Sequence, residues 1–210
     1  MIKSQQEKAE IFHSLHNNGK LLVLPNIWEP LGAALLEDLG YPAIATASAS
    51  VALTNGYADG ENIPFKEILV LFKKITAAVK IPVTADIESG YADNNVQLSE
   101  NIKNLINTGI VGINIEDTNK KNKKLYSMEQ QCERIRLIRS ISQRAGVSLF
   151  INARTDIFLH AAEFNSEEAK MNAVIDRAKA YREAGGDCFF PVLLVQESNI
   201  QILLSRSADL

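Results

Sequence analysis

Short apolar runs rich in β-branched residues alternate along the chain with longer amphipathic stretches. The apolar runs are nearly continuous, as in strands that are covered on both faces of a parallel sheet. They lie at residues 21–24, 43–46, 81–86, 111–116, 148–153 and 188–194. The stretches between them have the helical period and lie at residues 4–18, 28–39, 64–79, 96–108, 127–144, 166–184 and 196–205. This alternation predicts an α/β fold.

Helix-end signals support the same division. Ser127 and Gln130 form a capping box, and Ser166 precedes two glutamates in a first helical turn. Glycines that suit left-handed helix caps follow four predicted helices: Gly40, Gly109, Gly146 and Gly185. From the second strand onward, strands start 30 to 40 residues apart, which leaves room for one helix and two loops. Right-handed crossovers then produce either a barrel or a doubly wound sheet.

Composition narrows the functional classes. The 22 Lys and Arg residues against 25 Asp and Glu residues give a net charge of −3, which argues against a nucleic-acid partner. Two cysteines cannot form a disulfide framework, and no apolar run approaches the roughly 20 residues that span a bilayer. The first residues are polar, so we expect no secretory signal. We expect one cytoplasmic domain over residues 1–210, with no membrane partner.

Nucleotide-binding loops are missing from the sequence. There is neither a G-x-G-x-x-G segment nor a P-loop, which favours a barrel of the (β/α)8 type over a Rossmann-like sheet. In such barrels the site is built from the loops that follow the strands. Polar residues gather at these positions: Thr46, Ser48, Asp59, Asp86, Glu88, Glu116, Asp117, Arg154 and Asp156.

The spacing of these acids indicates a cation site. Asp86 and Glu88 are two residues apart, so both side chains point to the same side of an extended segment. With Glu116 from the next strand they form a group of carboxylates that suits Mg²⁺ or Mn²⁺ better than Zn²⁺. Arg154 could hold a substrate carboxylate in a bidentate fork. The alternative is that these acids only cap helices or pair with lysines.

Four segments in order carry a family resemblance: GYADGE (56–61), TADIESGYA (84–92), GINIED (112–117) and INARTD (151–156). With them the chain resembles the isocitrate lyase / phosphoenolpyruvate mutase superfamily over about residues 20–195. The resemblance implies a TIM-type barrel, a homo-oligomer (a dimer or a tetramer), Mg²⁺, and a small 2-oxo acid whose enolate is stabilised on the metal. Only about six β/α units are recognisable, so we expect a barrel that lacks strands 7 and 8.

The resemblance also implies roles for individual residues. Asp86 is similar to the direct metal ligand, and Asp59, Glu88 and Glu116 to the acids that hold metal-bound water. Arg154 is similar to the arginine that binds the substrate carboxylate. The segment Thr46-Ala47-Ser48 takes the place of a family segment that binds the same carboxylate. Two further assignments are Asn152 to substrate binding and Lys120, with Glu116 and Arg154, to catalysis.

Two departures leave the reaction open. The segment 117–127 lacks the cysteine and histidine that lyases of the family carry, and Val192 stands where they have a glutamate. Lys120 and Asn122 match the Lys-x-Asn pattern of the mutase branch. We therefore keep three hypotheses: an Mg²⁺-dependent lyase that cleaves a C–C bond in a 2-oxo or 2-hydroxy di- or tricarboxylate, a phosphonopyruvate-type P–C enzyme, and a non-catalytic oxo-acid-binding or truncated member.

Overall fold

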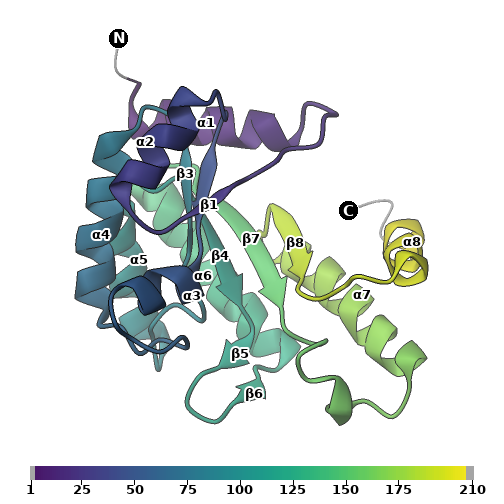
Figure 1. The fold of residues 1–210 in the computed structure, drawn as a ribbon. Coiled ribbons are helices and arrows are strands. Elements are labelled where there is room, and N and C mark those ends of the chain that lie inside the picture. The colour runs from purple at the N-terminus through teal and green to yellow at the C-terminus, as the bar shows by residue number, and fades with distance from the viewer. Residues whose placement is uncertain (1–2, 207–210) are drawn as a thin grey trace.

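The computed structural model describes residues 3–206 and contains one six-stranded parallel sheet (Figure 1). Its strand order is β1-β2-β3-β4-β7-β8, so each strand lies beside its neighbour in the chain once a small hairpin is set aside. The strands of the sheet are β1 Asn26–Ile27, β2 Ile44–Thr46, β3 Val83–Asp86, β4 Gly112–Glu116, β7 Phe150–Thr155 and β8 Cys188–Pro191. The hairpin pairs β5 Thr118–Asn119 with β6 Lys124–Leu125.

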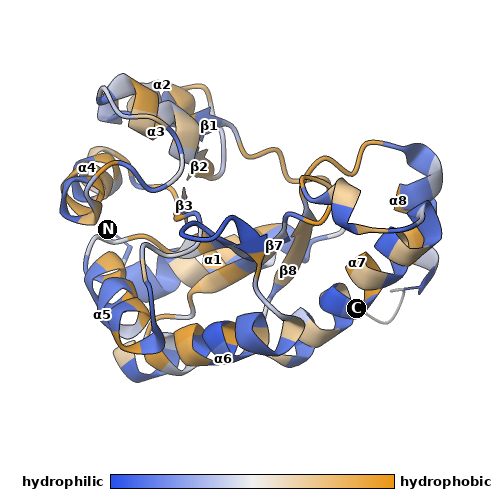
Figure 2. Ribbon diagram, turned by 90° about the horizontal axis from the view of Figure 1, so that it is seen from below, coloured by the Kyte–Doolittle hydropathy of each residue, from blue (hydrophilic) through white to orange (hydrophobic). Residues whose placement is uncertain are grey.

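Helices follow the strands and form an arc around the sheet (Figure 2). α1 lies apart from this arc and crosses the end where the strands begin (Figure 1). The helices are α1 Gln5–His16, α2 Pro30–Asp38, α3 Ser48–Thr54, α4 Phe65–Ala78, α5 Asn95–Ile106, α6 Met128–Ala145, α7 Glu167–Glu183 and α8 Glu197–Arg206, with a 3-10 turn η1 at Ala161–Glu163. The predicted α/β class with a parallel sheet is confirmed.

The predicted helix ends are present in detail. Ser127 Oγ accepts from the Gln130 amide at 3.2 Å, and the Gln130 side chain accepts from the Ser127 amide at 3.0 Å. Ser166 accepts from the Ala169 amide and begins α7. The four helix-terminal glycines all have positive φ angles, between 69° and 105°. Local signals in the sequence therefore place these helices correctly.

α1 closes the amino-terminal end of the sheet. Phe12 is fully buried there, with its ring 5.2 Å from that of Phe150 on β7. Gly112 on β4 makes this contact possible, because a Cβ atom would lie 2.9 Å from Phe12 and 2.8 Å from Thr84. The opposite end of the sheet, where the strands end, is left for polar side chains.

Some predicted boundaries are wrong. The first strand lies at Asn26–Ile27 and not at 21–24, since Leu21 and Val23 are exposed and make no pairing with β2. Cys188 was expected in a buried strand, yet it is exposed because β8 is an edge strand. α3 and the hairpin were not predicted.

The sheet does not close within residues 3–206. β1 and β8 are its two edges, and no strand in the described part of the chain joins them. The six units that the sequence predicts are therefore present as an open arc. None of the helices in this range is long and apolar enough to span a membrane.

Candidate active site

Buried charges gather where β3, β4 and β7 end. The parallel register places Asp86 beside Asn114, and Glu116 beside Arg154. Glu88 and Glu116 are each only 2% exposed. The structure thus brings together three of the predicted site residues, Glu88, Glu116 and Arg154, at the end of the sheet where a barrel site was expected.

Lys120 links the two glutamates. It lies in the β5–β6 hairpin, and its Nζ is 2.5 Å from Glu116 Oε1 and 3.2 Å from Glu88 Oε2. Burial alone would lower the pKa of Lys120, but the charges of Glu116 and Glu88 raise it above its usual value. Burial raises the pKa of Glu88 and, with the nearby charge of Asp156, raises that of Glu116 to about 7. Lys120 is therefore a protonated counter-ion inside the site, whereas Asn122 in the same hairpin is exposed.

Arg154 is fixed at two of its three guanidinium nitrogens. Nε donates to Asp156 Oδ1 at 2.7 Å, and Nη1 lies 3.2 Å from Glu116 Oε2. Burial opposes the charge of Arg154, but Glu116 and Asp156 raise its pKa. Within the described residues, Nη2 has no hydrogen-bond partner, so it remains available to a ligand.

The segment after β2 positions Asp86. Ser48 Oγ donates to Asp86 Oδ2 at 2.8 Å, and the Asp86 amide donates to Thr46 Oγ1 at 3.1 Å. The second carboxylate oxygen accepts from the Glu88 amide. Thr46, Ala47 and Ser48 were predicted to bind substrate; here both hydroxyls contact Asp86, and Ala47 only precedes α3.

Asp59 does not join the other acids. It is exposed in a turn, and no hydrogen bond or ion pair of its carboxylate is present in the described part of the chain. Glu61, two residues on, points inward in its place. Its Oε1 accepts from the Ser89 amide at 2.9 Å, the Ser89 hydroxyl at 2.7 Å and the Tyr91 amide at 3.0 Å. The predicted four-acid group is therefore incomplete.

Glu61, Glu88 and Tyr91 hold one another in strained backbone. All three have positive φ angles, of 60°, 50° and 53°, which cost non-glycine residues about 1–3 kcal/mol each. Glu88 Oε1 accepts from the Glu61 amide at 3.0 Å and from the Tyr91 hydroxyl at 2.9 Å. Such strain clusters at functional sites. Glu61 is the last residue of the GYADGE segment, and this segment is the sequence signal from which Glu61 could have been predicted as a site residue.

One further acid of the predicted group, Asp117, has structural contacts. It is fully buried and accepts from the Thr155 hydroxyl and the Asp156 amide, at 2.7 and 2.8 Å. Its other contacts are with Arg177 and Tyr181 of α7. Burial raises the pKa of Asp117, and the charge of Arg177 opposes this. Asp117 therefore ties the end of β4 to α7, and its partner is an arginine of that helix.

Asn152 lies on β7 two residues before Arg154. Its Nδ2 donates to Asn114 Oδ1 at 2.7 Å, which leaves Asn152 Oδ1 buried without a partner. An unpaired buried acceptor is costly, so a ligand hydroxyl or water would be favourable there. The role of Asn152 in substrate binding stays a prediction.

The donor set fits a divalent cation. Four carboxylates, those of Asp86, Glu88, Glu116 and Asp156, accompany only two cations, Lys120 and Arg154, in this part of the site. When all four are ionised, negative charge is in excess, and the donors are oxygens of the kind that Mg²⁺ and Mn²⁺ prefer. Within residues 3–206, no three Asp, Glu, His or Cys side chains converge to enclose an ion by themselves. Lys120 stands between two of the candidate ligands.

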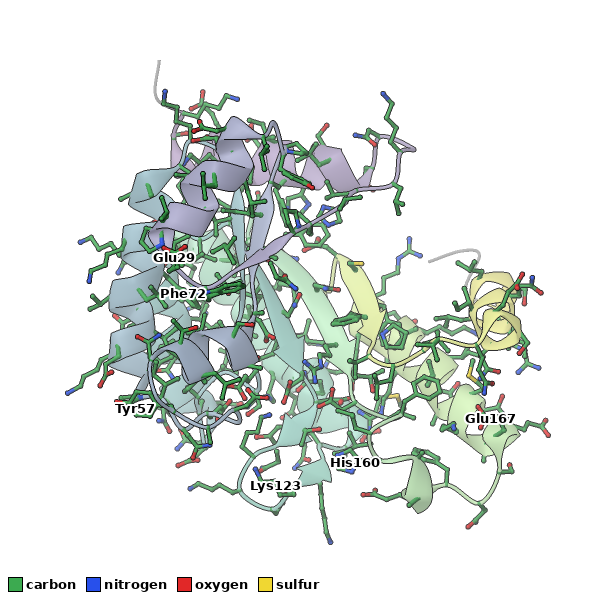
Figure 3. The ribbon with its side chains drawn as sticks, in the orientation of Figure 1. Glu29, Tyr57, Phe72, Lys123, His160 and Glu167 are labelled. Carbon is green, nitrogen blue, oxygen red and sulfur yellow. The ribbon has the colours of Figure 1, made fainter. Side chains whose placement is uncertain are left out.

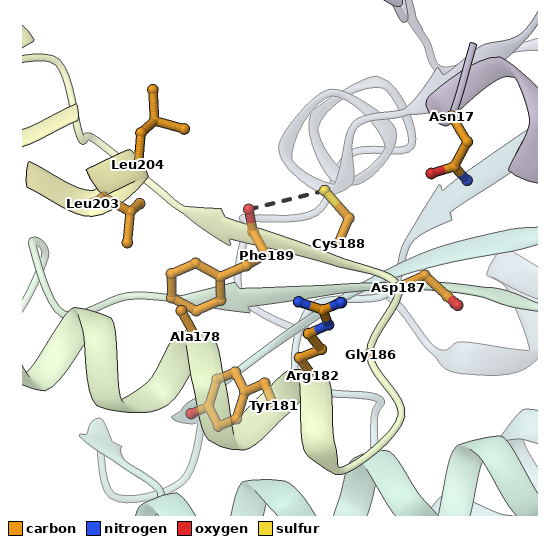
Figure 4. Close-up of a pocket in the computed structure, with 10 residues that line it drawn as sticks. All are labelled: Asn17, Ala178, Tyr181, Arg182, Gly186, Asp187, Cys188, Phe189, Leu203 and Leu204. Carbon is orange, nitrogen blue, oxygen red and sulfur yellow. Dashed lines mark hydrogen bonds between the residues drawn. The ribbon is translucent and has the colours of Figure 1, made fainter. Parts of the chain in front are cut away.

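A cavity elsewhere has different chemistry. It lies between α7, β8 and α8 and is lined mainly by apolar side chains, among them Tyr181, Phe189 and Leu204 (Figure 4). Asp187 at its rim already pairs with Arg139 and accepts from the Ile151 amide. The cavity is a hollow beside the open edge strand and brings no catalytic group to the candidate site.

The chain matches the model of a known protein family. Residues 12–209 match the family model described as phosphoenolpyruvate phosphomutase. The chain belongs to this family. The superfamily that the four sequence segments predict is thereby confirmed. The superfamily contains Mg²⁺-dependent C–C lyases and mutases.

Individual relatives share most of this chain. The 2-methylisocitrate lyase of Bacillus subtilis (strain 168) is 26% identical over 97% of the chain and 65% of its own length. A crystal structure from Burkholderia cenocepacia J2315, provisionally described as a phosphonomutase, is 38% identical with a TM-score of 0.90 and covers 95% of this chain and 80% of its own. Phosphonopyruvate hydrolase, solved with oxalate and Mg²⁺, shares the fold at 21% identity, with a TM-score of 0.82 over 94% of this chain and 68% of its own.

The chain spans less than two thirds of the length of the first of its curated relatives, 64% to 65%. The residues that match the family model, 12–209, include β1 to β8 and every residue of the candidate site.

Glu116 makes the stability of the metal-free protein depend on pH. Its folded-state pKa of about 7 lies above the ordinary 4.5, so the folded state holds the proton more tightly than the unfolded state. The resulting stabilisation is complete below pH 4.5 and is lost as the pH rises to about 7. We expect Glu116→Gln to flatten this fall, as measured by urea unfolding in EDTA at a series of pH values. Equal slopes in the variant and the wild type would contradict this prediction.

Lys120 competes with a cation for Glu88 and Glu116. We expect Lys120→Met to bind Mg²⁺ more tightly, on the order of tenfold, because no ammonium then neutralises the two carboxylates. Lys121→Met is the matched control, since Lys121 lies in the same hairpin and pairs with Asp93 at the exposed surface. Isothermal titration with Mg²⁺ measures both. Unchanged or weaker binding by Lys120→Met would show that Lys120 does not occupy the cation position.

Proposed function

We propose that this chain carries an Mg²⁺-dependent site that cleaves a C–C bond in a small 2-oxo or 2-hydroxy di- or tricarboxylate. The observation that carries the proposal is the buried group of Glu88, Glu116 and Arg154, with its excess of negative charge, at the ends of adjacent strands. A dication and an arginine in one pocket suit an anionic substrate that develops further charge on oxygen.

Each side chain has a role that follows from its contacts. Mg²⁺ held by Asp86, Glu88 and Glu116 would supply Lewis acidity and neutralise their charge. Arg154 binds the substrate carboxylate through Nη2, since Asp156 and Glu116 hold its Nε and Nη1. Lys120, whose Nζ lies 2.5 Å from Glu116 Oε1, holds protons beside this carboxylate. Because Glu116 is ionised when it holds the cation, Lys120 is our candidate to protonate the carbon released by bond cleavage.

The experiment is a screen for pyruvate release. Purified protein with Mg²⁺ is offered 2-methylisocitrate, 2,3-dimethylmalate and oxaloacetate, and pyruvate is followed by coupling to lactate dehydrogenase. Isocitrate is offered separately, and its cleavage is followed by the release of glyoxylate. We expect saturable, EDTA-sensitive turnover of one of these acids, which Asp86→Ala abolishes. Turnover that is unaffected by EDTA or by Asp86→Ala would contradict the proposed chemistry.

Lys120 also favours a second candidate, P–C bond cleavage of a phosphonopyruvate-type substrate. The lysine of the Lys-x-Asn pattern reaches the acids of the site, while Asn122 is exposed and bonds only within its own hairpin. Release of inorganic phosphate from phosphonopyruvate, lost in Lys120→Met, would support this candidate. Tight oxalate binding without turnover of any acid would support the non-catalytic, oxo-acid-binding hypothesis instead.

A further inference from the structure

A series of hydrogen-bond contacts leads away from the Nε of Arg154. Arg154 Nε donates to Asp156 Oδ1 at 2.7 Å, and the Thr118 hydroxyl contacts Asp156 Oδ2, also at 2.7 Å. His160 Nε2 lies 3.3 Å from the same hydroxyl, and its Nδ1 lies 2.9 Å from Glu163 Oε1. Figure 3 shows His160 near the hairpin that carries Lys123, at the same end of the sheet as the site.

The available hydrogens fix the direction of this series. Asp156 is paired with Arg154 and only accepts, so the single hydroxyl hydrogen of Thr118 is donated to Asp156. Thr118 must then accept at its other contact, which requires a hydrogen on His160 Nε2. A neutral imidazole carries one ring hydrogen, so donation from Nε2 to Thr118 and from Nδ1 to Glu163 occur together only in the doubly protonated ring. His160 and Arg154 therefore donate from the two ends of a series that meets at the Asp156 carboxylate.

Two members of this series, Asp156 and Thr118, are buried. Asp156 and Thr118 are 2% and 8% exposed, so water cannot readily replace a lost partner. The His160 ring is held in place by its backbone, whose amide donates to the Asp156 and Ile157 carbonyls in a tight turn. The same turn thus carries both His160 and Asp156, the first and third members of the series.

We propose that His160 is a positioning residue for Arg154, acting through Thr118 and Asp156. It fixes the Asp156 carboxylate, which in turn fixes the guanidinium plane and the direction of Nη2. This inference rests on the proposed function, because Nη2 is the group assigned to the substrate carboxylate. It predicts that His160 affects the affinity for a carboxylate ligand but not the affinity for the cation, since no contact joins His160 to Asp86, Glu88 or Glu116 in the described structure.

Two titrations on a set of variants test the proposal. Mg²⁺, and then oxalate in the presence of Mg²⁺, are titrated into wild type, His160→Leu, His160→Gln and the control Glu163→Gln. We expect His160→Leu to weaken oxalate binding by about tenfold, the size of one hydrogen bond, with Mg²⁺ binding unchanged. His160→Gln restores oxalate binding because its amide donates to Thr118, and Glu163→Gln resembles wild type.

Other outcomes overturn the proposal. Wild-type oxalate affinity in His160→Leu, or no recovery in His160→Gln, excludes a role for the Nε2 donor. Equal losses of Mg²⁺ and oxalate binding indicate a merely structural residue.

A measurement without ligand separates this inference from the proposed function. In ¹⁵N NMR spectra, the Arg154 Nε–H signal is expected to be sharp in wild type and His160→Gln, and broadened by exchange in His160→Leu. This NMR result does not depend on oxalate binding. If the wild-type protein binds no oxalate, that outcome contradicts the proposed function but not the positioning role of His160. An Arg154 signal that is identical in all variants would contradict the positioning role.

Discussion

Replacement of Arg154 by methionine is expected to weaken oxalate binding in the presence of Mg²⁺ on the order of 100-fold. The variant removes Nη2, a donor of the guanidinium that has no hydrogen-bond partner in the described part of the chain. Charge-assisted hydrogen bonds contribute about 1.5–3 kcal/mol, and the loss also leaves Asp156 without its positively charged partner. Isothermal titration with oxalate measures the change.

Arg136→Met is the matched control for this experiment, because Arg136 is exposed on α6. It should bind oxalate as wild type does. Arg154→Lys is expected to lie between, since an ammonium keeps the charge but cannot form the same fork. Oxalate affinity that is equal in Arg154→Met and wild type would show that the carboxylate binds elsewhere.

The second large effect is on stability. Asp117→Ala is expected to lower the free energy of unfolding by about 3–5 kcal/mol, because it leaves Arg177 without its buried partner. The Thr155 hydroxyl, the Asp156 amide and the Tyr181 hydroxyl lose an acceptor as well. In a chain of this size the melting temperature should fall by roughly 10 °C.

A double-mutant cycle isolates the ion pair in this network. If the cost arises from the stranded guanidinium, Asp117→Ala combined with Arg177→Met should be more stable than the sum of the single effects predicts. Asp176→Ala, at an exposed position of α7, should leave stability nearly unchanged. A loss below about 1 kcal/mol in Asp117→Ala would contradict the structural role assigned to Asp117.

The order of elements could be predicted because it depends on local patterns. Apolar runs of strand length and the capping residues at Ser127 and Ser166 act within a few residues of themselves, and they place five of the six strands and seven helices. Strand β1 was misplaced because the apolar run at 21–24 lies beside an open edge, where apolar side chains remain exposed. Hydrophobicity alone does not distinguish that edge from a covered strand.

The site could be predicted only to the level of the strand ends. The parallel register brings Glu116 beside Arg154, which follows from the positions of the two strands. The choice between Asp59 and Glu61 depends on a turn with a positive φ at Glu61, and the inward position of Lys120 depends on a hairpin of two-residue strands. Neither leaves a periodic signal, and Asp117 differs from Glu116 only in the face of the strand end on which it lies.

We propose that the acids and Arg154 together form a cation-dependent site for an oxo-acid anion. Oxalate resembles the planar enolate of pyruvate, so its titration into the wild-type protein, once with Mg²⁺ and once with EDTA, is the decisive test of this site. We expect saturable binding at one site with Mg²⁺ and none with EDTA. Binding that is equally strong without the metal, or no binding with it, would contradict the account.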